Sequence, residues 1–118
     1  MRNNSGYRKL IAWQKANLLA HLIYDITAKF PKDELFGMIS QMRRAALSVC
    51  ANIAEGYSRR GLKDRKHFYQ MAMGSLTELE FFIDFAYERQ FTGKDDYAKI
   101  LEIHMETARV LSGLLKST

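Results

Sequence analysis

Histidine, cysteine and serine side chains are the groups in this sequence that could bind a metal ion or act as nucleophiles. A di-metal centre in a helical protein needs Glu-x-x-His on two helices and a Glu from each of two others. None of His21, His67 and His104 has a glutamate three positions before it. Ser48 and Cys50 have no histidine three or four positions away. We therefore expect no catalytic residues, no metal and no cofactor, and we predict that the protein is not an enzyme.

The most concentrated charge in the chain is a basic run. Five of the 18 Lys and Arg residues fall within eight positions: Arg59, Arg60, Lys63, Arg65 and Lys66. Cations at this place could relieve the dipole at a helix C-terminus, or they could contact phosphate groups of a nucleic acid. We take the second alternative as the hypothesis for a binding site. Tyr57 and Tyr69 flank the run and could stack on unpaired bases, but either could equally belong to the core.

A polar stripe precedes the basic run. Arg44, Ser48, Asn52 and Glu55 stand at i, i+4, i+8 and i+11, so they share one side of a helix. The third predicted helix carries Glu78, and antiparallel packing could bring this residue close to Arg43 or Arg44. We predict a structural polar network, with direct ligand binding as the alternative. Its members would be Arg43, Arg44, Ser48, Asn52, Glu55 and Glu78.

The elements that position these residues are predicted to be helices. Apolar residues recur at steps of three and four, and no segment alternates as a strand would. The expected helices span about 7–30, 34–60, 63–91 and 95–116, and Gly61 is expected in the left-handed conformation after the second. Long helices of similar length with short connections predict an all-α, antiparallel up-down-up-down four-helix bundle in a single domain, 1–118.

The apolar stripes are wider than one bundle core requires. Phe81, Phe82 and Phe85 cannot all face the same axis. Scattered surface hydrophobes are a possible explanation, but we favour a self-association surface. Gly56 and Gly74 lie in the middle of predicted helices, where glycine is unfavourable, so we expect both to permit close packing.

The sequence also indicates where the protein resides. No run approaches the length of about 18 apolar residues expected of a membrane span, and the first residues lack the apolar block of a signal peptide. Cys50 is the single cysteine, so it cannot form an internal disulfide, and its apolar neighbours predict that it packs as a small hydrophobe. We expect a cytoplasmic protein without membrane contact.

Three strings in the sequence are specific enough to compare with a known family. They are Gln41-Met42-Arg43-Arg44-Ala45-Ala46, Asn52-Ile53-Ala54-Glu55-Gly56, and Gly74-Ser75-Leu76 followed by Glu78. With these strings, residues 7–93 resemble the 23S rRNA-intervening-sequence protein family, whose members are also called four-helix-bundle proteins.

The resemblance implies an all-α bundle without known catalytic activity that assembles into a ring, typically a pentamer. A related group serves as the accessory protein of diversity-generating retroelements and binds nucleic acid and a reverse transcriptase through a basic surface. Two functions therefore stay open. One is a homo-oligomer, expected to be a pentamer, whose basic surface binds RNA or DNA. The other is a structural scaffold that binds a protein partner and has no nucleic-acid role.

Overall fold

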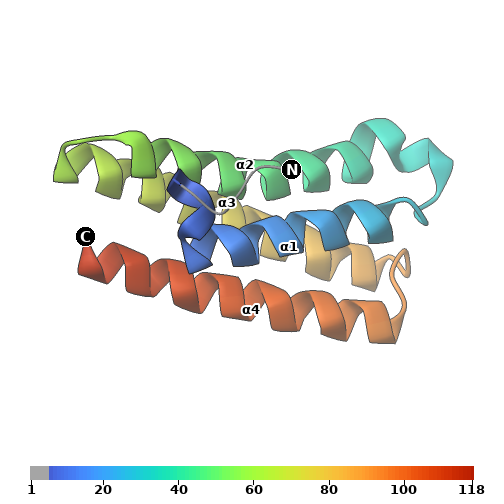
Figure 1. The fold of residues 1–118 in the computed structure, drawn as a ribbon. Helices are drawn as coiled ribbons and strands as arrows, with labels where there is room; N and C mark the ends of the chain where they lie inside the picture. The colour runs from blue at the N-terminus through green and yellow to red at the C-terminus, as the bar shows by residue number, and fades with distance from the viewer. Residues whose placement is uncertain (1–5) are drawn as a thin grey trace.

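The computed structural model describes residues 6–118, which form four long α-helices (Figure 1). Their bounds are α1 Ile11–Thr27, α2 Ser40–Ser58, α3 Leu62–Glu88 and α4 Lys94–Ser117. Consecutive helices pack against each other, and α4 returns to pack against α1. The predicted all-α, antiparallel up-down-up-down bundle is confirmed.

The first two helices are shorter than the predicted ranges 7–30 and 34–60. A separate 3-10 turn, Gly6–Lys9, precedes α1, which ends at Thr27. A second 3-10 turn, Lys32–Glu34, and an irregular segment, Leu35–Ile39, precede α2. The irregular segment is kinked because Gly37 has non-helical dihedral angles. A continuous helix therefore begins only at Ser40.

The turn between α2 and α3 differs from the prediction at Gly61. This residue has φ −79° and ψ 137°, so it is extended, and it precedes the first residue of α3. Arg59, which follows α2, is extended as well. The expected left-handed glycine after the second helix is therefore wrong, because the chain reverses through extended residues instead.

The left-handed residue occurs at the other end of α3, at Gln90, with φ 64°. The Phe91 N–H donates to the Ala86 carbonyl and the Gln90 N–H to the Tyr87 carbonyl, both at 2.9 Å. This pair of bonds is a Schellman motif, which satisfies carbonyl groups at a helix end. Because of it α3 ends at Glu88 rather than at the predicted residue 91.

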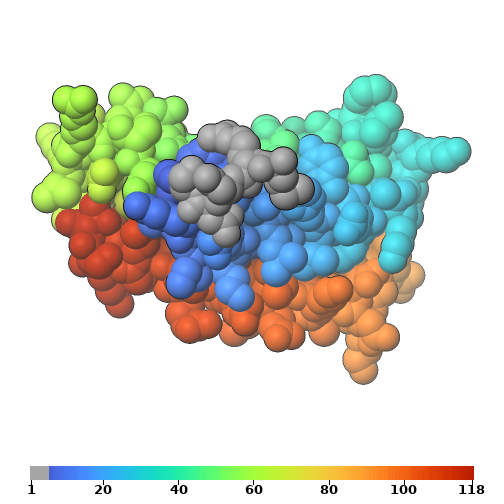
Figure 2. All heavy atoms as spheres, viewed as in Figure 1, coloured from blue at the N-terminus to red at the C-terminus, as the bar shows by residue number. Residues whose placement is uncertain are grey.

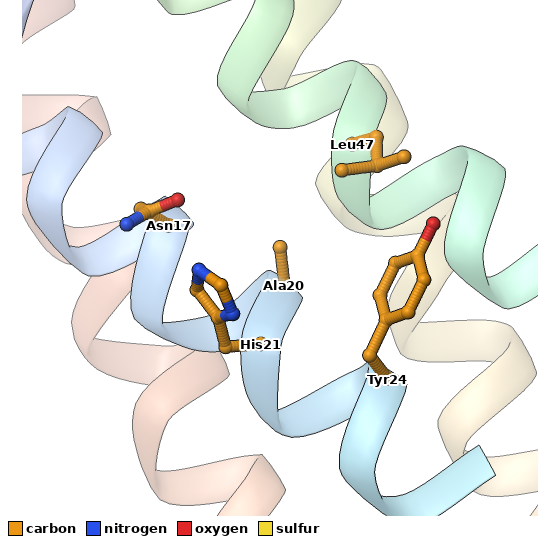
Figure 3. A pocket seen from close by; sticks show the side chains of 5 residues that line it. All are labelled: Asn17, Ala20, His21, Tyr24 and Leu47. Carbon is orange, nitrogen blue, oxygen red and sulfur yellow. The ribbon is translucent and has the colours of Figure 1, made fainter. Parts of the chain in front are cut away.

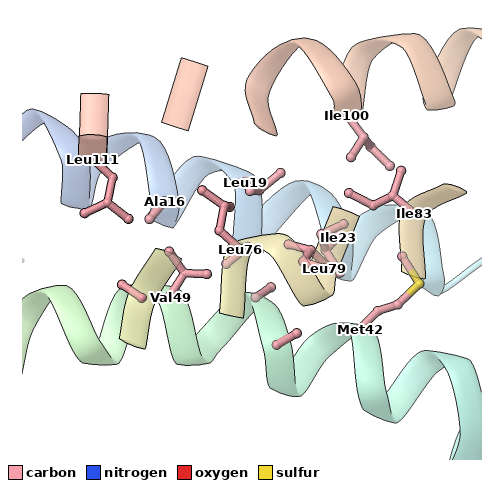
Figure 4. Packing of buried hydrophobic residues seen from close by; sticks show 14 of the residues in the cluster. Ala16, Leu19, Ile23, Met42, Val49, Leu76, Leu79, Ile83, Ile100 and Leu111 are labelled. Atoms are coloured by element: carbon pink, nitrogen blue, oxygen red, sulfur yellow. The ribbon is translucent and has the colours of Figure 1, made fainter. Parts of the chain in front are cut away.

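The core runs along the bundle axis and takes side chains from all four helices (Figure 4). Central members, each at most 1% exposed, are Leu19, Ile23, Met42, Val49, Leu76, Leu79, Ile83, Ile100 and Leu111. His104 is buried among them, and its Nε2 donates a hydrogen bond to the Leu76 carbonyl at 2.7 Å, as a buried polar group requires. No helix within residues 6–118 combines the length and apolar character needed to cross a membrane.

Gly56 brings α2 and α3 into close contact. A Cβ at this position would lie 2.7 Å from Cε1 of Tyr69 and 3.1 Å from Cβ of Phe68. The predicted packing role of Gly56 is therefore confirmed. The same prediction is wrong for Gly74 within this chain, because Gly74 is exposed and a Cβ there would have no neighbour within 4 Å.

Replacing Gly56 by alanine should destabilise the protein. The new methyl group would overlap the buried Tyr69 ring, and such overpacking costs about 1–3 kcal/mol, more than the gain of up to about 1 kcal/mol in helix propensity. Urea unfolding of Gly56→Ala is the measurement.

Gly113→Ala is the matched control, because that exposed glycine in α4 has nothing within 4 Å of a Cβ. Its stability should rise by about 0.5–1 kcal/mol. Equal stabilisation of both variants would contradict the close contact at Gly56.

Candidate nucleic-acid interface

The predicted basic residues lie at one end of the bundle, where α2 turns into α3. This turn forms the left end of the molecule, opposite the segment that leads into α2 (Figures 1 and 2). Arg59, Arg60, Lys63 and Lys66 are exposed there, and Arg65 is half-buried. The structure thus brings all five residues to one end, but their surroundings differ.

Arg65 is occupied within the protein itself. Its Nε donates to the Arg59 carbonyl at 2.6 Å and its Nη2 to the Tyr57 carbonyl at 3.2 Å. Its guanidinium also lies 5.5 Å from the centre of the Tyr57 ring. Carbonyl groups at a helix C-terminus have no partner within the helix, and a cation there also interacts favourably with the helix dipole. Arg65 therefore holds the end of α2 onto α3, which is the structural alternative that the sequence left open for cations at this helix end.

Arg59 is partly neutralised. Its Nη2 lies 3.0 Å from Oε2 of Glu55, one helical turn earlier, and its guanidinium lies over the Phe68 ring at 4.8 Å. Arg60, Lys63 and Lys66 have no ion-pair or side-chain hydrogen-bond partner within residues 6–118. The free cations of the predicted set are therefore these three, which we call the basic triad.

The two flanking tyrosines are not free to stack on bases. Tyr69 is 1% exposed and belongs to the core. Tyr57 is half-buried, and Lys9 Nζ lies over its ring at 5.7 Å in addition to Arg65. Lys9 thus joins this end of the bundle from the N-terminal 3-10 turn. Sequence reasoning missed Lys9 because it lies far from the basic run along the chain.

The polar stripe of α2 meets α3 in a set of direct contacts. Arg44 Nη2 lies 2.6 Å from Oε2 of Glu78, and the hydroxyl groups of Ser48 and Ser75 are 2.8 Å apart. Asn52 Nδ2 donates to the Ser48 carbonyl at 2.9 Å. The Asn52 bond lies within α2, whereas the other two contacts join α2 to α3 and fix how the helices align along their axes. Ser75 is a member that the sequence did not indicate.

Arg43 and Glu55 lie outside this set of contacts, although both were predicted members. Arg43 contacts α1: its Nε donates to Oγ1 of Thr27 at 3.0 Å, and its guanidinium lies 4.4 Å from the centre of the Tyr24 ring. Glu55 pairs with Arg59, the residue that directly follows α2. The two arginines are neighbours in sequence, so a helix directs them to different partners.

A shallow depression lies between α1 and α2 (Figure 3). It has a volume of about 250 Å³ and is lined by Asn17, Ala20, His21, Tyr24 and Leu47. The lining is mainly apolar, and His21 has no carboxylate or thiol beside it in this lining. Within residues 6–118 no three His, Cys, Asp or Glu side chains come together as a metal site would require.

Cys50 packs against the core, as predicted. Burial raises the pKa of its thiol to about 11. The thiol is therefore protonated at neutral pH, whereas a nucleophilic cysteine needs a lowered pKa. This environment does not favour a reactive thiol.

Comparisons with known proteins concern the whole bundle. The sequence model of the family described as 23S rRNA-intervening sequence protein matches residues 8–113. A crystal structure of a protein with unknown function from the S23 ribosomal protein family of Bacteroides thetaiotaomicron VPI-5482 is similar, with a TM-score of 0.81. The two chains are 19% identical, and the match covers 90% of this chain and 96% of the other. At this low sequence identity, the similarity shows that the two proteins share a fold and shows nothing about a shared function. No curated protein matches the sequence.

Arg65→Gln should destabilise the protein, whereas Lys66→Gln should not. The first change removes two hydrogen bonds and a cation–π contact, which together contribute about 1–2 kcal/mol. The second removes an exposed charge without a partner within residues 6–118, where effects stay within about 0.5 kcal/mol. Urea unfolding of both variants measures the difference. Equal stability would show that Arg65 is not a structural residue.

Proposed function

Because the chain belongs to the 23S rRNA-intervening sequence protein family, we propose that it is a non-enzymatic homo-oligomer whose basic end binds RNA or DNA. The family match confirms the resemblance seen in residues 7–93 and extends it to residue 113. The solved relative is described as having unknown function. Because that description names no function, support for the proposal comes from the charged and apolar surfaces of this chain itself. We also propose that the protein resides in the cytoplasm.

The basic triad is the observation that carries nucleic-acid binding. Arg60, Lys63 and Lys66 are exposed and unpaired within residues 6–118, and Arg59 and Lys9 add charge beside them. Lys and Arg side chains that neutralise phosphates release bound counterions, and this release drives binding that does not depend on base sequence. In an oligomer each subunit would contribute one triad, so the basic surface would grow with the number of subunits.

Self-association is supported by an apolar stripe on the outer face of α3. Met71, Phe81 and Phe85 are exposed on this face, and Gly74 lies between them at the same helical spacing of three and four. Glu78 also falls on this spacing, but it is charged and is ion-paired to α2. Phe81 is 61% exposed, and its ring packs on Phe82 and Phe85 with centroids 5.7 and 5.9 Å apart. This outer stripe explains why Gly74 has no neighbour within its own chain.

A second apolar surface makes a head-to-tail contact possible. The depression around Tyr24 and Leu47 lies between α1 and α2, so it is on a different face from the outer stripe. A contact between two unlike surfaces closes into a ring when its rotation allows. We infer that Phe81 and Phe85 of one subunit occupy this depression on the next. The pentamer implied by the resemblance is one such ring.

The alternative function is a scaffold that binds a protein partner without nucleic acid. The outer stripe of α3 favours it too, because exposed apolar surface also marks contacts between different proteins. Absorbance after lysis at low salt distinguishes the two functions. A nucleic-acid excess at 260 nm supports RNA or DNA binding, and a spectrum of clean protein supports the scaffold.

Disrupting either surface should abolish self-association. The double variant Phe81→Ser, Phe85→Ser removes the aromatic side chains, and Leu47→Glu places a charge at the depression. Light scattering should give a multiple of 13.7 kDa for the natural protein, five times for a pentamer, and 13.7 kDa for both variants.

Met105→Ser is the matched control, because Met105 is 68% exposed on α4 and belongs to neither surface. It should leave the measured mass unchanged. A monomeric natural protein, or a Leu47→Glu variant that still assembles, would contradict the head-to-tail contact.

Replacing the basic triad should weaken RNA binding without unfolding the protein. Arg60→Gln, Lys63→Gln, Lys66→Gln combined should lower affinity at low salt at least about tenfold, because three counterion-releasing contacts are lost. Arg65 is left in place because it stabilises the turn. Gel shift measures binding, and thermal unfolding confirms the fold.

The control carries the same change in charge at the opposite end of the bundle: Lys32→Gln, Lys94→Gln, Lys99→Gln. These three lysines are exposed as well. Equal affinity of the two triple variants would show that binding follows net charge alone and does not occur at the basic end.

A further inference from the structure

We propose, on the basis of the nucleic-acid binding proposed above, that the basic end binds the phosphate backbone of a duplex rather than unpaired bases. Proteins that bind single strands combine a basic groove with aromatic rings on which successive bases stack. Whether the aromatic rings near the basic triad are free or covered therefore distinguishes a single-strand ligand from a duplex.

The tyrosine and phenylalanine rings at this end are in contact with other groups of the protein itself. Cations of the chain lie over Tyr57 and Phe68, within 5.7 and 4.8 Å of the ring centres. The Tyr69 ring lies against Gly56 and is 1% exposed. A base that stacks on the cation-covered face of Tyr57 or Phe68 would have to displace Lys9, Arg65 or Arg59. Displacing Arg65 would also break its two hydrogen bonds to the end of α2.

His67 has the only exposed ring in the segment 55–69. It meets the Phe68 ring edge-on, with centroids 5.6 Å apart and planes at 70°. One imidazole cannot form the row of rings on which several bases stack. His67 is nevertheless the residue that a single-strand mode would use first, so it provides the decisive variant.

The spacing of the basic triad suits the regular phosphate backbone of a duplex. Lys63 and Lys66 are three residues apart near the start of α3, so their Cβ atoms are about 5–6 Å apart on one side of the helix. The backbone just before Arg60 is held as well, because Arg65 binds the carbonyl of Arg59. Cations carried on ordered backbone suit a duplex, whose phosphates have fixed positions. A duplex also releases more counterions per neutralised phosphate than a single strand does.

The test compares four fluorescent ligands of matched length and mixed sequence by anisotropy at one salt concentration. They are duplex RNA, duplex DNA and an unstructured single strand of each. We expect at least one duplex to bind about tenfold or more tightly than either single strand. The two duplex ligands separate recognition of A-form geometry from recognition shared with B-form DNA.

His67→Ala is measured with the same ligands, and thermal unfolding checks its fold. We expect its affinities to stay within about twofold of the natural protein, because a duplex offers no unpaired base to this ring; a lost stacking contact would instead lower affinity about fivefold or more. Equal or tighter binding of single strands, or a large loss in His67→Ala, would overturn this inference alone. Binding of neither duplex nor single strand would instead reject the proposed nucleic-acid function.

Discussion

The contact between Gly56 of α2 and the Tyr69 ring of α3 is the constraint on which the basic end depends. A side chain at position 56 would separate the two helices where they meet their shared turn. Because they stay close, Arg65 in α3 reaches the carbonyls of Tyr57 and Arg59 and fixes the end of α2. The turn is then short and ordered, and it presents Arg60, Lys63 and Lys66 outward.

Much of the fold was predictable, because apolar residues at steps of three and four specify helices regardless of distant contacts. Helix ends were less predictable. Gln90 adopts the left-handed conformation in a Schellman motif although it is not glycine. Phe91 next to it packs on Phe30, three residues after α1, with ring centroids 5.6 Å apart. A contact between residues so far apart in sequence is visible only in the folded chain.

The candidate site was predictable in composition but not in detail. The sequence places five basic residues in one run, but it cannot show that Arg65 binds carbonyl groups or that Arg59 pairs with Glu55. Both contacts depend on how α2 and α3 approach each other. The outer stripe of α3 was predictable in part: the surplus at Phe81, Phe82 and Phe85 indicated an apolar surface, but the sequence did not show that Met71 and Gly74 lie on the same face.

The basic end and the outer stripe lie apart along α3. Lys63 and Phe81 are separated by about 27 Å at a rise of 1.5 Å per residue, so assembly and nucleic-acid binding can be altered independently. The salt dependence of duplex binding by the natural protein tests the central claim most directly. The logarithm of the association constant should fall linearly with the logarithm of salt concentration, with a slope of about −2.7 or steeper, because at least three phosphates are neutralised. An affinity that does not change with salt would contradict binding through the basic triad.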